Sequence, residues 1–505
     1  MSIVVMSAIV AYISGIVAES SMYISPTHWK LKRIIAWFVL ATNVYYCLIV
    51  VKYIDANLFV AGLLFVTIYR LINLIKIIVS RIKYQQLISS CSRSFGVLAS
   101  IQTAFSILVF VMYFNDLKIS SQSITLYLAF ITLISSMVVF VSTIVNIINT
   151  RTSPQKYFSD SELPTVTVAI AARNETESLF QCIQSVLYDS YPKLEIIVYD
   201  DESSDRTLDI IRDFAHDGVR FIQGGKVPNN WLAKNYAYEI LSEQSAGEII
   251  MFIGVDIRLH MNSIRTSVSQ LIEKNIDMLT IMPKRAQMGL VAMIIQPMRY
   301  WWEIAVPRNR LSRPPALSST WLIYKSQLVK IGGFVAFKGA ILPENHIANI
   351  LFRKNKYGFI RSSSDLQITT HKDFSEQWIN AVRTRYPQNH RRPESIMLVT
   401  AFLLLCVVLP FILIFVILFT NLPLWYEIIF ALCVFMYIVS HSIISYFTNP
   451  ILCIFAAINF PIVVLMDVVL LNYSMLKYEF STVIWKGRNV SDSAMHVYKK
   501  LPKLD

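Results

Sequence analysis

Acidic side chains follow two apolar runs of the sequence, at the point where each run ends. The run LEIIVYDD (194–201) ends in Asp200 and Asp201, and the run GEIIMFIGVD (247–256) ends in Asp256. A divalent cation held by carboxylate oxygens neutralises a diphosphate and stabilises it as a leaving group. An acid at the end of the first run can also hydrogen-bond a base or a ribose. One strand-end aspartate alone is more often a solvated turn residue, whereas two such ends in one unit favour a ligand site.

An alternation of predicted strands and helices positions these acids. The buried-strand run TVTVAIAA (165–172) is followed by a predicted helix at 173–187, for which Asn174 is the expected cap. Further strands are expected at 194–203, 219–225 and 247–256, with helices at 204–215 and 231–244. Strands that alternate with helices predict a parallel sheet, with ligands at the carboxyl ends of the strands. Both acid clusters fall at that edge.

The composition predicts a membrane protein with one globular insert. The chain has 505 residues, of which 55% are hydrophobic and only 16% are charged, and a soluble protein of this size carries more charge. The apolar residues concentrate in 1–150 and 396–475. Spans of about 20 apolar residues are expected near 2–18, 34–53, 57–79, 94–114, 123–148, 397–419, 426–446 and 449–472. The six cysteines form no CxxC or Cys/His cluster, so we expect neither disulfides nor a zinc site.

Basic residues beside the spans set the expected topology. They follow the first, third and fifth spans, which places the insert in the cytoplasm of a multi-pass cell-membrane protein. The net charge of +13 is explained by these flanks and by anionic lipid, and nucleic acid is not an expected partner. Three C-terminal crossings would put the basic tail outside, whereas a re-entrant segment near 449–461 would return it to the cytoplasm. Both arrangements stay open.

Six short motifs, in a specific order and spacing, carry a resemblance to a known family. They are AARNETESL (171–179), IIVYDDESSDRT (196–207), VPNNWLAKNYA (227–237), KIGGF (330–334), FSEQWINAVRTRY (374–386) and WKGRN (485–489). With them the sequence resembles family-2 glycosyltransferases of the GT-A fold. It is most similar to the membrane-bound branch of hopene-associated and diaponeurosporenoate glycosyltransferases. The similarity covers about 163–387 and the WKGRN tail.

The resemblance implies an α/β GT-A (nucleotide-diphospho-sugar transferase) domain at 156–395, inserted between transmembrane helices at 1–155 and 396–505. It implies a UDP- or GDP-sugar donor, a Mg²⁺ or Mn²⁺ ion and inversion at the anomeric carbon. In that family Asp256 would stand at the metal-binding second acid of a DxD motif, and Lys234 would approach the donor phosphates. The nucleoside and its pocket would involve Asp200, Asp201, Arg173, Asn174 and Glu175.

The sequence departs from the family pattern at two positions. Gly254 replaces the first acid of DxD, and in LPENHIANIL (342–351) Asn345 stands where the base aspartate should be. An asparagine does not accept a proton at neutral pH, and the acceptor hydroxyl must lose one. The flanking Glu344 and His346 are the substitutes, although neighbours on a helix point in different directions. An alternative role for Glu344 is that of an acid at the start of a helix. An alternative role for His346 is that of a plain polar partner.

An apolar, aromatic stretch near 287–306 resembles the interfacial helix of this group, which lies on the membrane and receives a lipid acceptor. A buried core helix is the alternative. The motif Gln-x-x-Arg-Trp of processive synthases is matched only weakly, by VRTRY (382–386). The transfer of a single sugar is therefore expected.

Three functional hypotheses follow. The first is a glycosyltransferase that moves one sugar from a nucleotide donor to a lipid at the cytoplasmic face. The second is a GT-A domain that has lost catalysis and serves as a binding or assembly subunit of a glycolipid or cell-envelope pathway. The third, a transporter, is disfavoured because the spans carry few charges, Asp467 being the main exception.

Overall fold

The computed structural model describes residues 3–24, 28–55, 57–80, 85–115, 121–152, 158–286, 300–309, 311, 313–372, 374–417, 423–448, 450 and 453–490. The chain forms two compact units. The first comprises Met1–Leu128, Asn389–Phe402 and Leu471–Ser481, and the second comprises Ala129–Gln388, Leu403–Leu470 and Thr482–Asp505. Within the described residues, eight helices are long and apolar enough to cross a membrane: five before the sheet and three after it.

The first unit is helical. Its helices include α1 (Ile3–Ile24), α2 (Trp29–Tyr53), α3 (Leu58–Val79), α4 (Gln85–Phe114) and α14 (Pro393–Ala401). A charged pair lies in its interior: the Arg70 guanidinium is 2.5 Å from the Glu19 carboxylate and also donates to Asn43 and Gln102. The sequence analysis singled out Asp467 as the main charged exception, and the structure adds the Arg70–Glu19 pair of α3 and α1. A pair that is satisfied by partners in this way is compatible with an apolar surrounding.

The second unit is built on a seven-stranded mixed sheet in the order β3-β2-β1-β4-β8-β6-β9. The strands are β1 (Val166–Ala172), β2 (Leu194–Asp200), β3 (Val219–Gln223), β4 (Ile249–Ile253), β6 (Met278–Met282), β8 (Thr320–Tyr324) and β9 (Tyr357–Arg361). The first four strands in this order are parallel, as predicted. Beyond these predicted strands the sheet is mixed, because β8 runs antiparallel to both β4 and β6.

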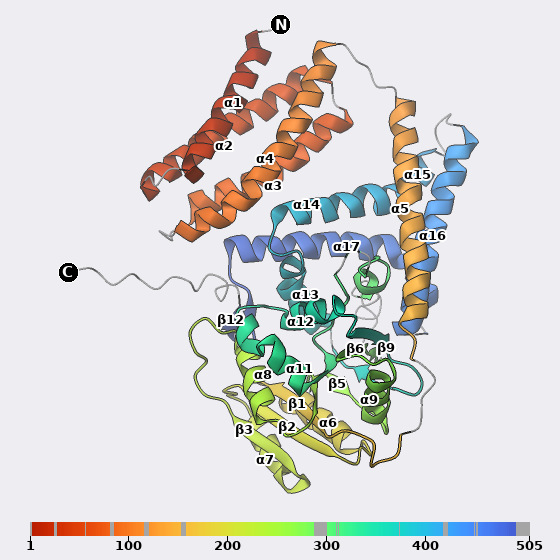
Figure 1. Cartoon of the computed structure of the whole chain (residues 1–505). Coiled ribbons are helices and arrows are strands. Elements are labelled where there is room, and N and C mark those ends of the chain that lie inside the picture. Colours follow the sequence, from red (N-terminus) through yellow and green to blue (C-terminus); the bar gives the residue numbers. More distant parts are fainter. Residues whose placement is uncertain are drawn as a thin grey trace, which may run out of the picture. The chain divides into compact units, whose positions relative to one another are not determined.

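Two layers of helices cover the sheet (Figure 1). Alternate residues of β1 face opposite sides: Val168 and Ile170 belong to one buried cluster and Ala169 to another, as the two-residue period of a strand requires. The first face is covered by α6 (Thr176–Leu187), α7 (Thr207–Asp213) and α9 (Ser263–Glu273). The second is covered by α8 (Ala233–Gln244), α11 (Lys325–Ile331) and α12 (Pro343–Phe352). With both faces covered, most residues of the strands are apolar.

Smaller elements complete this unit. A second sheet holds β5 (Ile257–Arg258), β10 (Thr369–Thr370) and β7 (Lys284–Arg285), in the order β5-β10-β7. The longer helices are α5 (Ser121–Asn149), α13 (Phe374–Gln388), α15 (Leu409–Ile417), α16 (Leu424–Thr448) and α17 (Cys453–Phe480), of which α5 and α17 are shared with the first unit. Short helical turns span Phe214–Asp217 and Phe334–Phe337, and a π-helix spans Phe402–Val408.

Three predictions made from the sequence concern these elements: the cap of α6, the interfacial helix and the C-terminal crossings. Asn174 is not the cap of α6: Glu175 takes that place, and Asn174 adopts a φ of 50°. Of the expected interfacial helix, 287–299 lie outside the described residues, and 300–304 form a helix in which Trp301 is buried. Helix α17 runs without a break through Pro461, while residues 449, 451 and 452 lie outside the described residues. The number of C-terminal crossings therefore stays a prediction.

A C-terminal hairpin, β11 (Ile484–Trp485) and β12 (Arg488–Asn489), lies against the ends of β1 and β2. The Arg488 guanidinium donates to both carboxylate oxygens of Asp201 at 2.7 and 2.9 Å and to Glu202 at 2.6 Å. The Lys486 ammonium is 2.8 Å from the Glu175 carboxylate. The Arg383 guanidinium lies 4.5 Å from the centroid of the Trp485 ring. The sequence motif WKGRN (485–489) forms this hairpin. Its charged side chains Lys486 and Arg488 hold this late segment of the chain at the ends of the strands.

We predict that Arg488→Ala loosens the hairpin. Charge-assisted bonds of a partly buried pair stabilise their segment by more than an exposed pair does, so amide exchange within 483–490 should accelerate about tenfold. Hydrogen exchange followed by mass spectrometry measures it. The control is Arg206→Ala, because Arg206 is 83% exposed and lies 4.0 Å from Asp209. Equal exchange in both variants would contradict the assignment.

Candidate active site

A cavity of about 270 Å³ opens at the carboxyl ends of β1, β2 and β4. We call it the strand-end cavity. Five of the residues singled out from the sequence line it: Arg173, Glu175, Asp201, Lys234 and Asp256. They come from separate segments that the sheet brings to one edge. Other charged residues of its lining are Lys372, Glu376, Arg383 and Lys486. The strand-end cavity is therefore rich in cations as well as carboxylates, which suits a ligand carrying several negative charges.

Asn174 and Asp200, which were also predicted here, do not line the strand-end cavity. The Asn174 side chain accepts a hydrogen bond from the Ser204 backbone N–H at 2.9 Å, and the Asn174 N–H donates to the Ser203 hydroxyl at 3.0 Å. The Asp200 carboxylate accepts from the Ser203 N–H at 3.3 Å. Both residues thus join the loops that follow β1 and β2. They shape the rim of the strand-end cavity without facing into it.

Two carboxylates of the strand-end cavity are held by the C-terminal hairpin. Burial raises the pKa of Asp201, and the Arg488 guanidinium opposes that shift. Burial likewise raises the pKa of Glu175, which the Lys486 ammonium opposes. The Arg173 guanidinium donates to the Lys486 carbonyl at 2.8 Å and to the Asp201 carbonyl. These contacts join the C-terminal hairpin to the loops after β1 and β2, and the sequence analysis did not assign Lys486 or Arg488 to this site.

Lys234 joins the strand-end cavity to the base motif. It lies at the start of α8, and its ammonium is 3.6 Å from the Glu344 carboxylate. Burial lowers the pKa of Lys234. Glu344 raises it, and the positive charges of Arg383 and Lys372 lower it further. The positive charges of Arg383 and Lys372 thus both act on Lys234, and Glu344 is its counter-charge. The sequence pointed to Lys234 and missed the other two cations, because both lie outside the strand-end motifs.

The three residues of the base motif have different environments. Glu344 is 0% exposed at the first turn of α12. Asn345 is half-buried and His346 is exposed, with the His346 ring stacked on Phe337 at 5.7 Å between centroids. Of the three, Glu344 alone lines a cavity of those described. The geometry thus separates Glu344 from its neighbours, as the helical arrangement of side chains requires.

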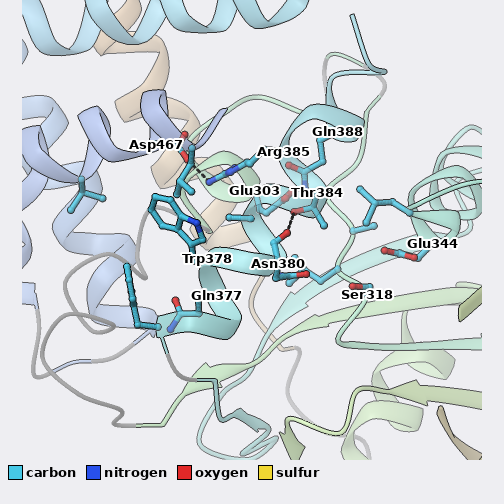
Figure 2. A pocket seen from close by; sticks show the side chains of 17 residues that line it. Glu303, Ser318, Glu344, Gln377, Trp378, Asn380, Thr384, Arg385, Gln388 and Asp467 are labelled. Atoms are coloured by element: carbon cyan, nitrogen blue, oxygen red, sulfur yellow. Dashed lines mark hydrogen bonds and ion pairs between the residues drawn. The ribbon is translucent and has the colours of Figure 1, made fainter. Parts of the chain in front are cut away.

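A second cavity, of about 80 Å³, lies between α12, α13 and α17. We call it the helix-side cavity. Glu344 lies at one end and Asp467 at the other, as Figure 2 shows. The Asp467 carboxylate is 2.6 Å from the Arg385 guanidinium and accepts from the Trp302 indole N–H at 2.7 Å. The charge of α17 that stood out in the sequence is therefore paired. The remaining lining includes Ser318, Trp378, Asn380, Thr384, Val463 and Leu470.

The surroundings of Asp256 do not fit the divalent cation that the sequence predicted. One oxygen of its carboxylate accepts from the Thr370 hydroxyl at 2.6 Å and lies 3.1 Å from the Lys372 ammonium. Gly254 provides no second carboxylate. Among the described residues, no group of three or more His, Cys, Asp or Glu side chains could hold a metal ion. An ammonium at this distance already supplies the positive charge that a cation would bring.

Comparisons with known proteins agree with this architecture. Residues 167–319 match the model of glycosyl transferase family 2. Glycosyltransferase AglE of Haloferax volcanii is 31% identical over 122 residues, which are 23% of this chain and 39% of that protein. The 4,4'-diaponeurosporenoate glycosyltransferase of Staphylococcus haemolyticus is 32% identical over 97 residues, 19% of this chain and 25% of that one. The probable glycosyltransferase YdaM of Bacillus subtilis is 36% identical over 110 residues, 21% and 26%. The matches thus span less than half the length of each relative.

The solved structures that match part of this chain include the mannosyltransferase PcManGT from Pyrobaculum calidifontis, in complex with GDP-Man and Mn²⁺. It has a TM-score of 0.43 and 15% identity over 70% of this chain and 96% of that one. S. aureus TarS has a TM-score of 0.32 and 14% identity over 56% and 44%. The mixed sheet, the strand-end acids and the family match agree on a GT-A domain. Residues 167–319 thus form a domain that matches glycosyl transferase family 2.

Proposed function

We propose that the protein transfers one sugar from a UDP- or GDP-sugar to a hydroxyl of a lipid acceptor, with inversion, at the cytoplasmic face of the membrane. The family match supports glycosyl transfer, and the eight apolar helices support a membrane setting. The basic flanks of the first, third and fifth spans support the cytoplasmic side. Under this proposal 156–395 are the cytoplasmic domain, and 1–155 and 396–505 supply the membrane helices.

The donor would occupy the strand-end cavity. A nucleotide-sugar brings two negative charges on its diphosphate, and Lys234, Lys372 and Arg383 gather around this cavity to meet them. Asp201, which faces both this cavity and the adjoining one along 227–235, is placed to accept hydrogen bonds from the nucleoside. We assign no step to Mg²⁺ or Mn²⁺, because the side chains around Asp256 do not fit such an ion.

The acceptor would occupy the helix-side cavity. One of its walls is α17, which supplies the apolar Val463 and Leu470 from a helix apolar enough to span a membrane. Polar groups of α13 and the Arg385–Asp467 pair supply hydrogen-bonding partners at the same place. An acceptor with an apolar chain and a hydroxylated head group matches both kinds of wall. The small volume suits the head group of one acceptor molecule rather than a growing polysaccharide.

The position of Glu344 is the observation that carries this proposal. Its buried carboxylate lines the helix-side cavity, and its ion-pair partner Lys234 lines the strand-end cavity. Ser318 and Asn380 line both cavities. An acceptor hydroxyl in one cavity and a donor sugar in the other would therefore meet beside this carboxylate. Asn345 and His346, the alternative base residues, face neither cavity.

The reaction is a single displacement. The acceptor oxygen attacks the anomeric carbon from the side opposite the diphosphate, and the bond between that carbon and the phosphate oxygen breaks. The acceptor proton passes to the Glu344 carboxylate, and the products are the glycosylated lipid and a nucleoside diphosphate. Positioning a general base in this way contributes about 10²–10⁴-fold to a rate. Inversion follows because there is one displacement and no covalent enzyme intermediate.

A second candidate function is a binding or assembly subunit without catalysis. Gly254 and Asn345 favour it, because both family positions that are most demanding for the chemistry have changed. The buried position of Glu344 favours the enzyme over the binding subunit. A glutamate whose only role was to start a helix would not need to line one cavity and pair with a lysine of the other.

We predict that Glu344→Gln abolishes sugar transfer and leaves donor binding intact. The amide keeps the shape of the side chain but does not accept the acceptor's proton, so the transfer rate should fall at least about 100-fold. Transfer is measured with labelled UDP- and GDP-sugars and a lipid extract, and donor binding by calorimetry. Glu239→Gln on α8 is the control, since Glu239 lines neither cavity. Unchanged transfer in Glu344→Gln would contradict the assignment of the base.

We also predict that Val463→Phe blocks the acceptor and spares the donor. Val463 is 1% exposed and faces the helix-side cavity, so a larger ring there would fill the space for the head group. Transfer to lipid should drop about tenfold or more, while UDP and GDP binding should not change. The matched control is Ile462→Phe, because Ile462 is 59% exposed on the same helix. If both variants transfer sugar equally well, the acceptor does not enter through this cavity.

A further inference from the structure

We propose that Lys372 does the work of the divalent cation in this protein, so that the donor diphosphate is bound by an ammonium cluster without a metal. This inference rests on the proposed function and names how the same site holds its substrate. Asp256 then has a different role from the predicted one. It fixes the Lys372 ammonium in the strand-end cavity instead of coordinating an ion.

The backbone places Lys372 beside Asp256. Strand β10 pairs with β5 in an antiparallel register that sets Thr370 opposite Ile257. The His371 N–H donates to the Asp256 carbonyl at 2.8 Å, so the chain leaves β10 directly alongside Asp256. The Lys372 ammonium then lies 3.1 Å from the Asp256 carboxylate, and the pair is only partly open to solvent. An ion pair held by a strand register in this way does not depend on the chance orientation of a surface lysine.

Gly254, which stands at the first acid position of the DxD motif, is part of the same arrangement as the Asp256–Lys372 pair. A Cβ atom built on Gly254 would lie 2.7 Å from the second oxygen of the Asp256 carboxylate. The carboxylate has therefore turned into the space that an aspartate at 254 would need. Its other oxygen faces Thr370 and Lys372. An aspartate at 254 would require the Asp256 carboxylate to rotate away from its present position, so Gly254 leaves room for the observed ion pair.

The charges of the strand-end cavity suit an anion better than a metal ion. Three of its carboxylates have cationic partners within the protein: Glu175 pairs with Lys486, Asp201 with Arg488 and Asp256 with Lys372. Lys234, Lys372 and Arg383 line this same cavity, and the positive charges of Lys372 and Arg383 lower the pKa of Lys234. A clustered set of cations in a cleft raises the local concentration of anions. A further divalent cation would be repelled by the same cluster.

An ammonium group can supply the chemistry that the reaction demands. When the bond from the anomeric carbon to the phosphate oxygen breaks, the diphosphate leaves with one more negative charge than it carried in the donor. A fixed cation aimed at that charge stabilises it most in a cavity with limited access to water. Lysine binds phosphate as a compact point charge with three donors. The proton of the acceptor still goes to Glu344, so atoms and charges balance without a metal.

The experiment compares nucleoside-diphosphate binding with and without metal. UDP and GDP are titrated separately into the full-length protein in detergent, once in EDTA and once in MnCl₂. We expect one of them to bind with dissociation constants that agree within about twofold between the two conditions. Lys372→Met should weaken that binding about tenfold in both conditions, since it removes one charged partner of the diphosphate. Lys330→Met is the matched control because Lys330 is exposed on α11.

The other outcomes separate the two proposals. If a nucleoside diphosphate binds only in MnCl₂, Lys372 does not replace the cation, and the glycosyltransferase proposal stands. If Lys372→Met binds as tightly as the Lys330→Met control, Lys372 is no diphosphate ligand, and the inference is wrong. If neither UDP nor GDP binds in either condition, the proposed donor site itself fails. Thermal unfolding of each variant checks that the loss of affinity does not come from a loss of folding.

Discussion

The ion pair between Lys234 and Glu344 is the interaction on which the site depends. The two groups lie 3.6 Å apart, Glu344 is fully buried, and Lys234 is largely so. A buried carboxylate without a nearby cation would take up a proton, and a buried ammonium without a nearby anion would lose one. The Lys234 ammonium and the Glu344 carboxylate are therefore each other's nearby counter-charge. Because Lys234 faces the strand-end cavity and Glu344 faces the helix-side cavity, the pair also fixes where donor and acceptor would meet.

Distant segments of the chain are needed to build that arrangement. The strand ends supply the carboxylates, α8 supplies Lys234, and α12 supplies Glu344. The segment after β10 adds Lys372, α13 adds Arg383, and the C-terminal hairpin adds Lys486 and Arg488. Most of these cations face a carboxylate of another segment. Electrostatic pairing thus joins the sheet, the helices and the hairpin around one cavity, and it leaves the cations together where a diphosphate would lie.

The sequence predicted much of this. Strand and helix periods located β1 to β4 and the helices between them, because both faces of the sheet are covered and the strands are mostly apolar. The ends of those strands pointed to Asp201 and Asp256. The antiparallel entry of β8 was not predictable, since a short apolar run carries no information about its direction. Lys372 lies outside every quoted motif, where a lone lysine is usually solvated. Arg383 lies inside FSEQWINAVRTRY (374–386), but nothing in that motif indicates which of its side chains reach the cavity. The position of Asn174 in the sequence predicts a helix cap. Its left-handed backbone instead places it in the loop after β1, where it contacts Ser203 and Ser204.

The most direct measurement is a structure of the full-length protein with a bound nucleoside diphosphate. The terminal phosphate should lie in the strand-end cavity between Lys234 and Lys372, with the side where the sugar would be attached turned toward Glu344. A nucleotide whose terminal phosphate lay away from both lysines, or toward the opposite side from Glu344, would contradict the proposal that donor and acceptor meet at this pair.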